Sequence, residues 1–152
     1  MKLGDIMKKW SAICIFLIIA VSSLSFVCAE QSTTIGGHNF KIPDGFKENS
    51  MFTAVNEPDE TGDVLNSVKA FEKGGDVIYI CVGHFINENL TSQNVSSIGN
   101  EAKTINGVEG YTFDDGYVKG YNNIHGFIYE SKGDLIIVLT TDENLFDQVV
   151  GK

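Results

Sequence analysis

Two short apolar segments constrain the fold more than any other feature of the chain. Residues 77–82 and 135–139 are apolar at every position, and each closely follows a turn that contains glycine. A strand with apolar side chains on both faces is typical of the middle of a sheet, where both faces are covered. We therefore predict two central strands with protein packed on each side of the sheet.

Turn residues divide much of the remaining chain into hairpins. The Gly74-Gly75 pair separates residues 64–85 into the two arms of a long hairpin. The Asn106-Gly107 pair divides residues 102–113 in the same way, because asparagine and glycine both suit the positive φ angles of a type I′ turn. Strands joined by such short turns are antiparallel neighbours.

The C-terminal third adds another strand pair and a helix. Residues 117–121 are expected to pair with residues 124–130, and Asp142 is expected to cap a helix over residues 143–150. The whole pattern predicts an α+β fold: an antiparallel β-sheet of six to eight strands with a C-terminal helix packed on one face.

The first 29 residues are typical of a secretory signal peptide. Lys8 and Lys9 precede an apolar stretch at residues 13–21, and Val27 and Ala29 suit the −3 and −1 positions of a signal-peptidase site. We therefore expect a secreted or extracytoplasmic protein, with residues 1–29 removed as the signal peptide.

Cleavage at this site leaves residues 30–152 as a single α+β domain that begins at Glu30. Three alternatives stay open. Translation starting at Met7 gives a more compact leader. Cys28 is the residue that a lipoprotein signal would modify, although the valine before it is larger than such a signal prefers. Residues 10–27 would serve as an N-terminal membrane anchor if uncleaved, although they fall short of the roughly 20 apolar residues that span a bilayer.

The charge of the mature chain excludes one class of partner. Residues 30–152 carry eight lysines, no arginine and nineteen acidic residues. Nucleic-acid binding requires a basic surface, so we expect no nucleic-acid partner, and direct binding to an anionic membrane is disfavoured for the same reason. Cys81 is the only cysteine of this domain, so no internal disulfide forms, and its apolar neighbours predict a buried thiol. We expect a monomer.

Three features carry a resemblance to a known group of domains. They are Phe40-x-Ile42-Pro43-x-Gly45-Phe46, the Ile105-Asn106-Gly107-Val108 turn, and the apolar strand followed by a helix at the end. Over residues 35–150 the chain resembles small extracytoplasmic PsbP/Mog1-like domains and the uncharacterised secreted domains of methanogenic archaea. The resemblance implies an assembly or accessory role without a bound ligand, and it carries over no functional residue. The short final helix departs from the family pattern and leaves one sheet face less fully covered.

Few residues are candidates for catalysis. His38, His84 and His125 lack the spacing of metal ligands, so we expect no metal and no cofactor. Asp114 and Asp115 precede a glycine and are typical of a hairpin end. Together with His125, however, they are also the groups that a small secreted hydrolase would use for general acid–base catalysis.

The remaining candidates concern contact with a partner. Tyr117, Tyr121 and His125 are predicted to form a contact surface, since tyrosines beside amide side chains suit recognition. Asn89 and Asn94 each begin a glycosylation sequon. The sequence thus predicts a non-enzymatic binding or accessory module at the cell envelope with an unidentified envelope or extracellular partner. The alternative is the hydrolase.

Overall fold

The two apolar strands lie side by side at the centre of the sheet, as predicted. The structure, a computed structural model, describes residues 31–151. In it β6 (Asp76–Phe85) pairs antiparallel with β10 (Asp134–Thr140), and Ile80 lies opposite Val138. Both side chains are fully buried. Full burial on this face of the sheet, and partial burial on the other, explain why these segments carry almost no polar residue.

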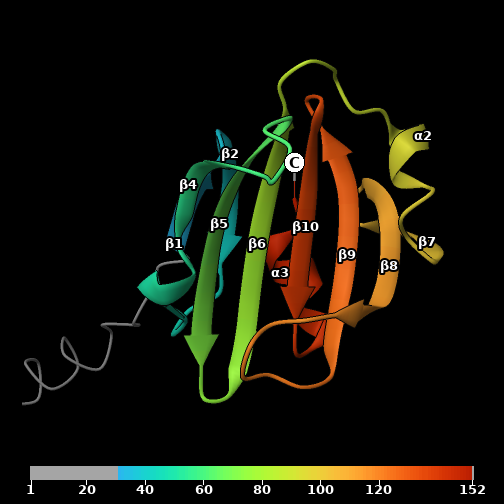
Figure 1. Ribbon diagram of the computed structural model, residues 1–152. Coiled ribbons are helices and arrows are strands. Elements are labelled where there is room, and N and C mark those ends of the chain that lie inside the picture. Colours follow the sequence, from blue (N-terminus) through green and yellow to red (C-terminus); the bar gives the residue numbers. More distant parts are fainter. Residues whose placement is uncertain (1–30, 152) are drawn as a thin grey trace, which may run out of the picture.

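Eight strands form one antiparallel sheet in the spatial order β3-β5-β6-β10-β9-β8-β7, and β4 pairs with another part of β5 (Figure 1). The other strands are β3 (Lys47–Glu48), β4 (Ala54–Pro58), β5 (Val64–Lys73), β7 (Glu101–Ile105), β8 (Val108–Gly116) and β9 (Ile124–Ser131). The predicted α+β class with six to eight antiparallel strands is confirmed.

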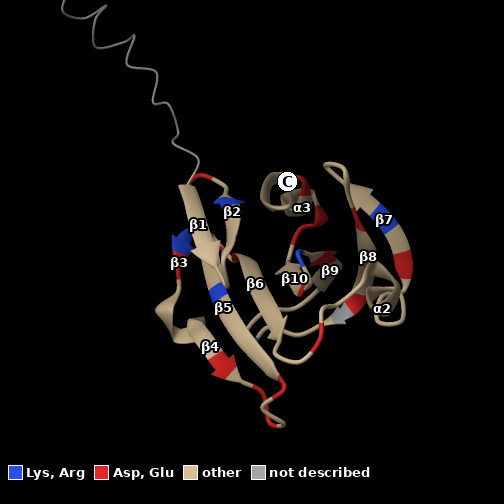
Figure 2. Cartoon of the chain, turned by 90° about the horizontal axis from the view of Figure 1, so that it is seen from above, with Lys and Arg blue, Asp and Glu red and all other residues tan. Residues whose placement is uncertain are grey.

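A separate hairpin and the C-terminal helical segment cover one face of the sheet. The hairpin consists of β1 (Gln31–Ile35) and β2 (His38–Ile42), and the helical segment consists of η2 (Glu143–Leu145) and α3 (Phe146–Val149). Figure 2 shows that the sheet curves around α3. The core on this concave face comprises Ile35, Phe40, Ile42, Phe46, Phe71, Ile78, Ile80, Val82, Ile105, Phe127, Tyr129, Ile136, Val138, Leu145, Phe146, Val149 and Val150.

The predicted cap of the C-terminal helix is present, but the helix is short. The Asp142 side chain accepts a hydrogen bond from the backbone N–H of Asn144. The first turn is a 3₁₀ turn, and regular α-helix ends at Val149 instead of Val150. A helix this short depends on tertiary packing, which the buried Leu145 and Phe146 provide.

The opposite, convex face is covered only in part. Val77 and Leu139 are buried there, whereas Tyr79 and Ile137 are partly buried. Three irregular segments lie over this face: η1 (Ser50–Phe52), residues 117–123 and α2 (Ser92–Val95). The sheet is therefore asymmetric, with one dry face and one face that water reaches.

Residues 117–121 do not form the predicted strand. Strand β9 instead pairs with β8 on one side and β10 on the other, which leaves no edge for residues 117–121. Gly120 and Asn123 have positive φ angles of 94° and 54°, which end an extended conformation. The segment is a loop anchored by the buried side chain of Val118.

The tight hairpin has the predicted turn. Asn106 and Gly107 have φ angles of 50° and 78°, as a type I′ turn requires, and Ile105 pairs with Val108 across it. The Asn106 side chain also donates hydrogen bonds to two backbone carbonyls of the C-terminal segment, those of Asp147 and Val150. The turn therefore ties the outer hairpin to the end of the chain.

Between residues 31 and 151, none of the helices has the length and apolar character needed to cross a bilayer. The predicted signal peptide, residues 1–29, lies outside the described residues. Its cleavage, its alternatives and the extracytoplasmic location stay predictions.

Candidate functional site

A groove runs between α2 and the outer hairpin of the sheet, and we call it the α2–β7 groove. Its volume is about 520 Å³, which lies within the range of sites that hold small ligands or peptide side chains. Hydroxyl, amide and carboxylate groups share the lining with one aromatic ring. The lining residues are Ser92, Gln93, Val95, Ser96, Ala102, Lys103, Thr104, Glu109, Gly110, Tyr111 and Glu130.

The wall formed by α2 is fixed by local sequence. Thr91 and Asn94 form a capping box, in which the Thr91 backbone N–H donates to the Asn94 side-chain oxygen at 3.0 Å. Val95 is buried against the sheet and anchors the helix. The chain then passes so close to Tyr111 that any side chain at Gly99 would collide with the Cβ of Tyr111. The groove is consequently bounded by elements that hold their positions.

The opposite wall is the free edge of the sheet. Strand β7 pairs with β8 and ends the strand order, so its other side faces no strand among residues 31–151 (Figure 1). Its first four residues are exposed. Ile98, in the segment that leads into β7, is an apolar side chain with 53% of its surface exposed.

The groove carries more negative than positive charge. Glu109 and Glu130 line it, and Glu130 accepts a hydrogen bond from the backbone N–H of Gly133 at 2.8 Å. Lys103 is the only lysine of the lining, and its ammonium group lies 3.4 Å from the Glu143 carboxylate. Its charge is therefore partly offset by Glu143, and the two glutamates leave the groove acidic.

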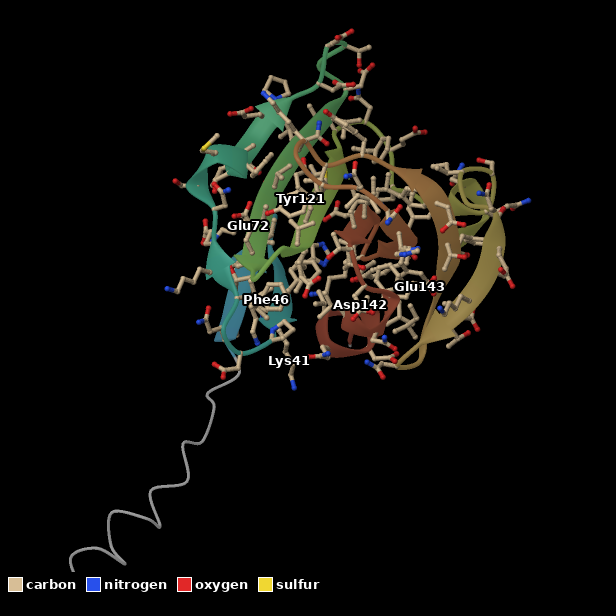
Figure 3. All side chains as sticks on the ribbon, turned by 90° about the horizontal axis from the view of Figure 1, so that it is seen from below. Lys41, Phe46, Glu72, Tyr121, Asp142 and Glu143 are labelled. Atoms are coloured by element: carbon tan, nitrogen blue, oxygen red, sulfur yellow. The ribbon has the colours of Figure 1, made fainter. Side chains whose placement is uncertain are left out.

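The three predicted contact residues occupy different surroundings. Tyr117 is 77% exposed, whereas Tyr121 packs against the apolar cluster of the convex face. Figure 3 shows Tyr121 beside Glu72. Burial, and then the hydrogen bond and charge of Glu72, raise the pKa of Tyr121. His125 is half-buried and contacts the carboxylates of Asp114 and Glu143. The contact surface around Tyr117 stays a prediction.

The residues proposed for hydrolysis are partly brought together. The Asp114 carboxylate lies 3.4 Å from His125 Nδ1, and the Glu143 carboxylate lies at the same distance from the same nitrogen. The Asp114 side chain is 86% exposed. Neither the α2–β7 groove nor the second groove described below is lined by Asp114 or His125, so neither groove would hold a substrate against these groups.

The two sequon asparagines lie on the segment that crosses from β6 to β7. Asn89 and Asn94 are both exposed, and Asn94 belongs to the capping box of α2. Because α2 forms one wall of the groove, a glycan on Asn94 would stand next to it. Their glycosylation stays a prediction.

No protein-family model, curated protein or solved structure matches this chain. The function is therefore inferred from the geometry of its own residues. The resemblance to PsbP/Mog1-like domains stays a prediction.

One polar cluster has no counterpart in the sequence analysis. His38 Nε2 lies in hydrogen-bonding contact with Asp134 Oδ2 at 2.8 Å, and His84 Nδ1 with Asp134 Oδ1 at 2.7 Å. His38 and Asp134 are buried, whereas His84 is exposed. Residue spacing gave no signal, because the histidines lie 96 and 50 positions before the aspartate. Only the folded topology brings them together.

This cluster has a structural role that the topology makes clear. The β1–β2 hairpin shares no backbone ladder with the eight-stranded sheet, so its packing on the sheet depends on side-chain contacts. The contact between His38 and Asp134 attaches β2 to the start of β10. Within residues 31–151, no group of three or more histidine, cysteine, aspartate or glutamate residues is arranged to hold a metal ion.

Cys81 lies in a second groove on the convex face, with a volume of about 460 Å³. The thiol is half-buried rather than fully buried, and its sulfur lies 3.9 Å from Asn66 Oδ1. Burial raises the pKa of the Cys81 thiol to about 11. A nucleophilic cysteine needs a lowered pKa, so this residue has the opposite character. The other lining residues are Met51, Phe52, Thr53, Ala54, Glu57, Pro58, Asn66, Val68 and Tyr79.

Proposed function

We propose that this chain is a non-enzymatic extracytoplasmic module that binds a partner protein at the cell envelope, with the α2–β7 groove as its binding site. The observation that carries the proposal is the position of this groove beside the free edge of β7. The extracytoplasmic location rests on the signal-peptide pattern of residues 1–29.

The chemistry of the groove supports binding to a protein. An exposed sheet edge offers unpaired backbone donors and acceptors in a regular row, and the groove adds side-chain hydroxyls, amides and one tyrosine ring next to that row. The exposed Ile98 adds apolar area at the same place. Because secondary structure fixes both walls, a partner would meet a site that is already formed, which lowers the entropy cost of binding.

The hydrolase is the weaker candidate. In its favour, Asp114 and His125 lie within 3.4 Å of one another. General acid–base catalysis also requires a bound substrate held within hydrogen-bonding distance of those groups, and the strong exposure of Asp114 provides no such enclosure. Binding therefore accounts for the geometry better than catalysis does.

Site-specific photo-crosslinking in the cells that export the protein tests the proposal. A photoreactive residue replaces Gln93, which lines the groove, and in a control it replaces Gln148, an exposed glutamine of α3 on the other side of the sheet. A discrete crosslinked protein from position 93 and none from position 148 is expected. A third variant at Tyr117 tests the tyrosine contact surface.

The outcomes separate the alternatives. Crosslinking from position 117 without crosslinking from position 93 would move the binding site to the exposed loop and overturn the assignment of the groove. A lack of product at all three positions would refute a stable protein partner. Hydrolysis of a peptide, ester or glycoside by the purified protein, abolished in H125A, would replace the binding function with the catalytic one.

A further inference from the structure

The outer edge of β7 presents backbone groups in a defined pattern. The two-residue Asn106-Gly107 turn makes Ile105 and Val108 a hydrogen-bonded pair, and pairs alternate along an antiparallel ladder. Lys103 therefore directs its N–H and C=O toward β8. Ala102 and Thr104 direct theirs outward, where residues 31–151 supply no strand to receive them. Two donors and two acceptors are thus available in a row.

The side chains of these two residues face the groove. Ala102 lies opposite Tyr111 and Thr104 lies opposite Glu109, and all four line the α2–β7 groove. A strand added beside β7 would lie about 4.8 Å away, with every second side chain on the same face of the sheet as these four. Those side chains would point toward the groove. Backbone pairing and side-chain recognition would therefore use one continuous surface.

The charges of the groove favour a basic occupant. Glu109 and Glu130 line the groove, while the ammonium group of Lys103 is 3.4 Å from Glu143. The sequence from residue 30 onward has nineteen acidic residues against eight lysines. A second copy of this chain is disfavoured as occupant, because two β7 strands paired about their centres would place Lys103 opposite Lys103.

We propose that the partner binds through an extended, lysine- or arginine-rich segment that adds to β7 as a further antiparallel or parallel strand. This inference rests on the proposed function, since it assigns the kind of partner that the groove receives. Affinity comes from main-chain hydrogen bonds to Ala102 and Thr104, and preference for basic sequences comes from Glu109 and Glu130.

Amide hydrogen exchange with a defined probe tests the pairing. The probe is an eight-residue peptide that alternates lysine and threonine, and its control alternates glutamate and threonine. With the basic peptide at ten times its Kd, exchange at the Ala102 and Thr104 amides is expected to slow about tenfold. The Lys103 amide already pairs with β8, so its exchange is the internal reference and stays nearly unchanged.

Two independent changes, one in the protein and one in the peptide, each remove backbone hydrogen bonds between them. Thr104→Pro deletes an outward N–H that the ladder with β8 does not use, and proline is accepted at such edge positions. It is expected to weaken binding about tenfold, whereas Thr104→Val, which keeps the amide and removes only the side-chain hydroxyl, is expected to weaken binding much less. The basic peptide with alternate amides N-methylated is expected to bind the unaltered protein about tenfold more weakly, because it lacks the donors.

Charge is tested separately. Glu109→Gln is expected to weaken binding of the basic peptide about two- to fivefold, with a smaller salt dependence, as removal of one exposed charge does. Glu57→Gln, at the distant β4 edge, is the control and has no effect.

The results distinguish the inference from the function on which it rests. Equal binding by the N-methylated peptide and by T104P would overturn strand addition and leave the groove as a binding site. Preference for the acidic peptide would overturn the basic partner. If no extended peptide binds but position 93 still crosslinks to a protein, the inference fails and the proposed function stands. If position 93 forms no crosslink either, both fail.

Discussion

Replacing Ile80 and Ile137 in turn with aspartate measures the asymmetry of the sheet. Ile80 is fully buried on the concave face, and Ile137 is partly buried on the convex face. The two lie on neighbouring central strands, one residue out of register with each other, because Ile80 pairs with Val138. Because the substitution is the same at both positions, the difference between the two variants in the free energy of unfolding measures how much more deeply the concave face is buried than the convex face.

The magnitudes follow from burial. Ile80→Asp forfeits about 2–3 kcal/mol of apolar burial and places a carboxyl where ionisation costs about 4 kcal/mol or more. The sum of about 6–7 kcal/mol exceeds the lower end of the free energy of unfolding that domains typically have, about 5–15 kcal/mol. At Ile137 the carboxylate can reach water, so only part of the burial is lost, about 1–2 kcal/mol.

Urea unfolding followed by circular dichroism gives both values. Ile80→Asp is expected to be largely unfolded without denaturant, and Ile137→Asp to unfold cooperatively at a lower urea concentration than the unaltered protein. Ile80→Val is the control for shortening alone and costs about 0.5–1.5 kcal/mol. Equal losses at positions 80 and 137 would refute the asymmetric sheet, and a native-like melt of Ile80→Asp would refute the central position of β6.

Three other predictions concern chemistry along the chain. Burial raises the pKa of the Cys81 thiol to about 11. The thiol should therefore react with iodoacetamide about 100-fold more slowly at pH 8 than a thiol of pKa 9, and its reaction rate should keep rising up to pH 10. Rapid labelling of the folded protein at pH 8 would contradict this. The exported chain should begin at Glu30 by intact mass, and a mass that retains residues 10–27 would indicate an anchor. In a host that glycosylates exported proteins, Asn89 and Asn94 should carry glycans detectable by mass spectrometry of their peptides, and unmodified peptides alone would exclude their use as acceptors.

Hairpins and central strands were predictable because their signals are local. The turn at Asn106-Gly107 requires positive φ angles that few residues accept, and β6 is apolar on both faces because one face is fully covered and the other is covered in part. These features are set by the residues themselves. Sequence reasoning therefore placed the long hairpin at the bounds that the structure has, from Val64 to Phe85.

Segments whose state depends on distant partners were harder to predict. Residues 117–121 have strand-forming side chains, but both edges of β9 are already occupied, so they remain a loop. Strand β4 extends to Pro58, inside a segment whose composition is that of a loop, because the edge of β5 is free to pair with it. Composition carries no information about which sheet edges are available.

The candidate site depended even more on topology. The α2–β7 groove joins a four-residue helix to an edge strand, and the sequence offers only a weak helix pattern at α2. Likewise, His38 and His84 meet at Asp134 only after β2 has folded over the sheet. Residue spacing predicts which side chains are neighbours on the same helix or strand. The groove and the histidine–aspartate cluster each combine residues from several elements, so spacing does not predict them.

The place of β10 in the strand order affects how the chain reaches its folded state. It is the last strand along the described chain, yet it lies between β6 and β9. The first half of the sheet therefore cannot join the second half until residue 140 is available. The pairing of β6 with β10 connects parts of the sequence more than 50 residues apart, and such non-local pairing slows folding. A polypeptide leaving the ribosome has no complete core until residue 140 has emerged, and until then it can still be threaded through a narrow channel.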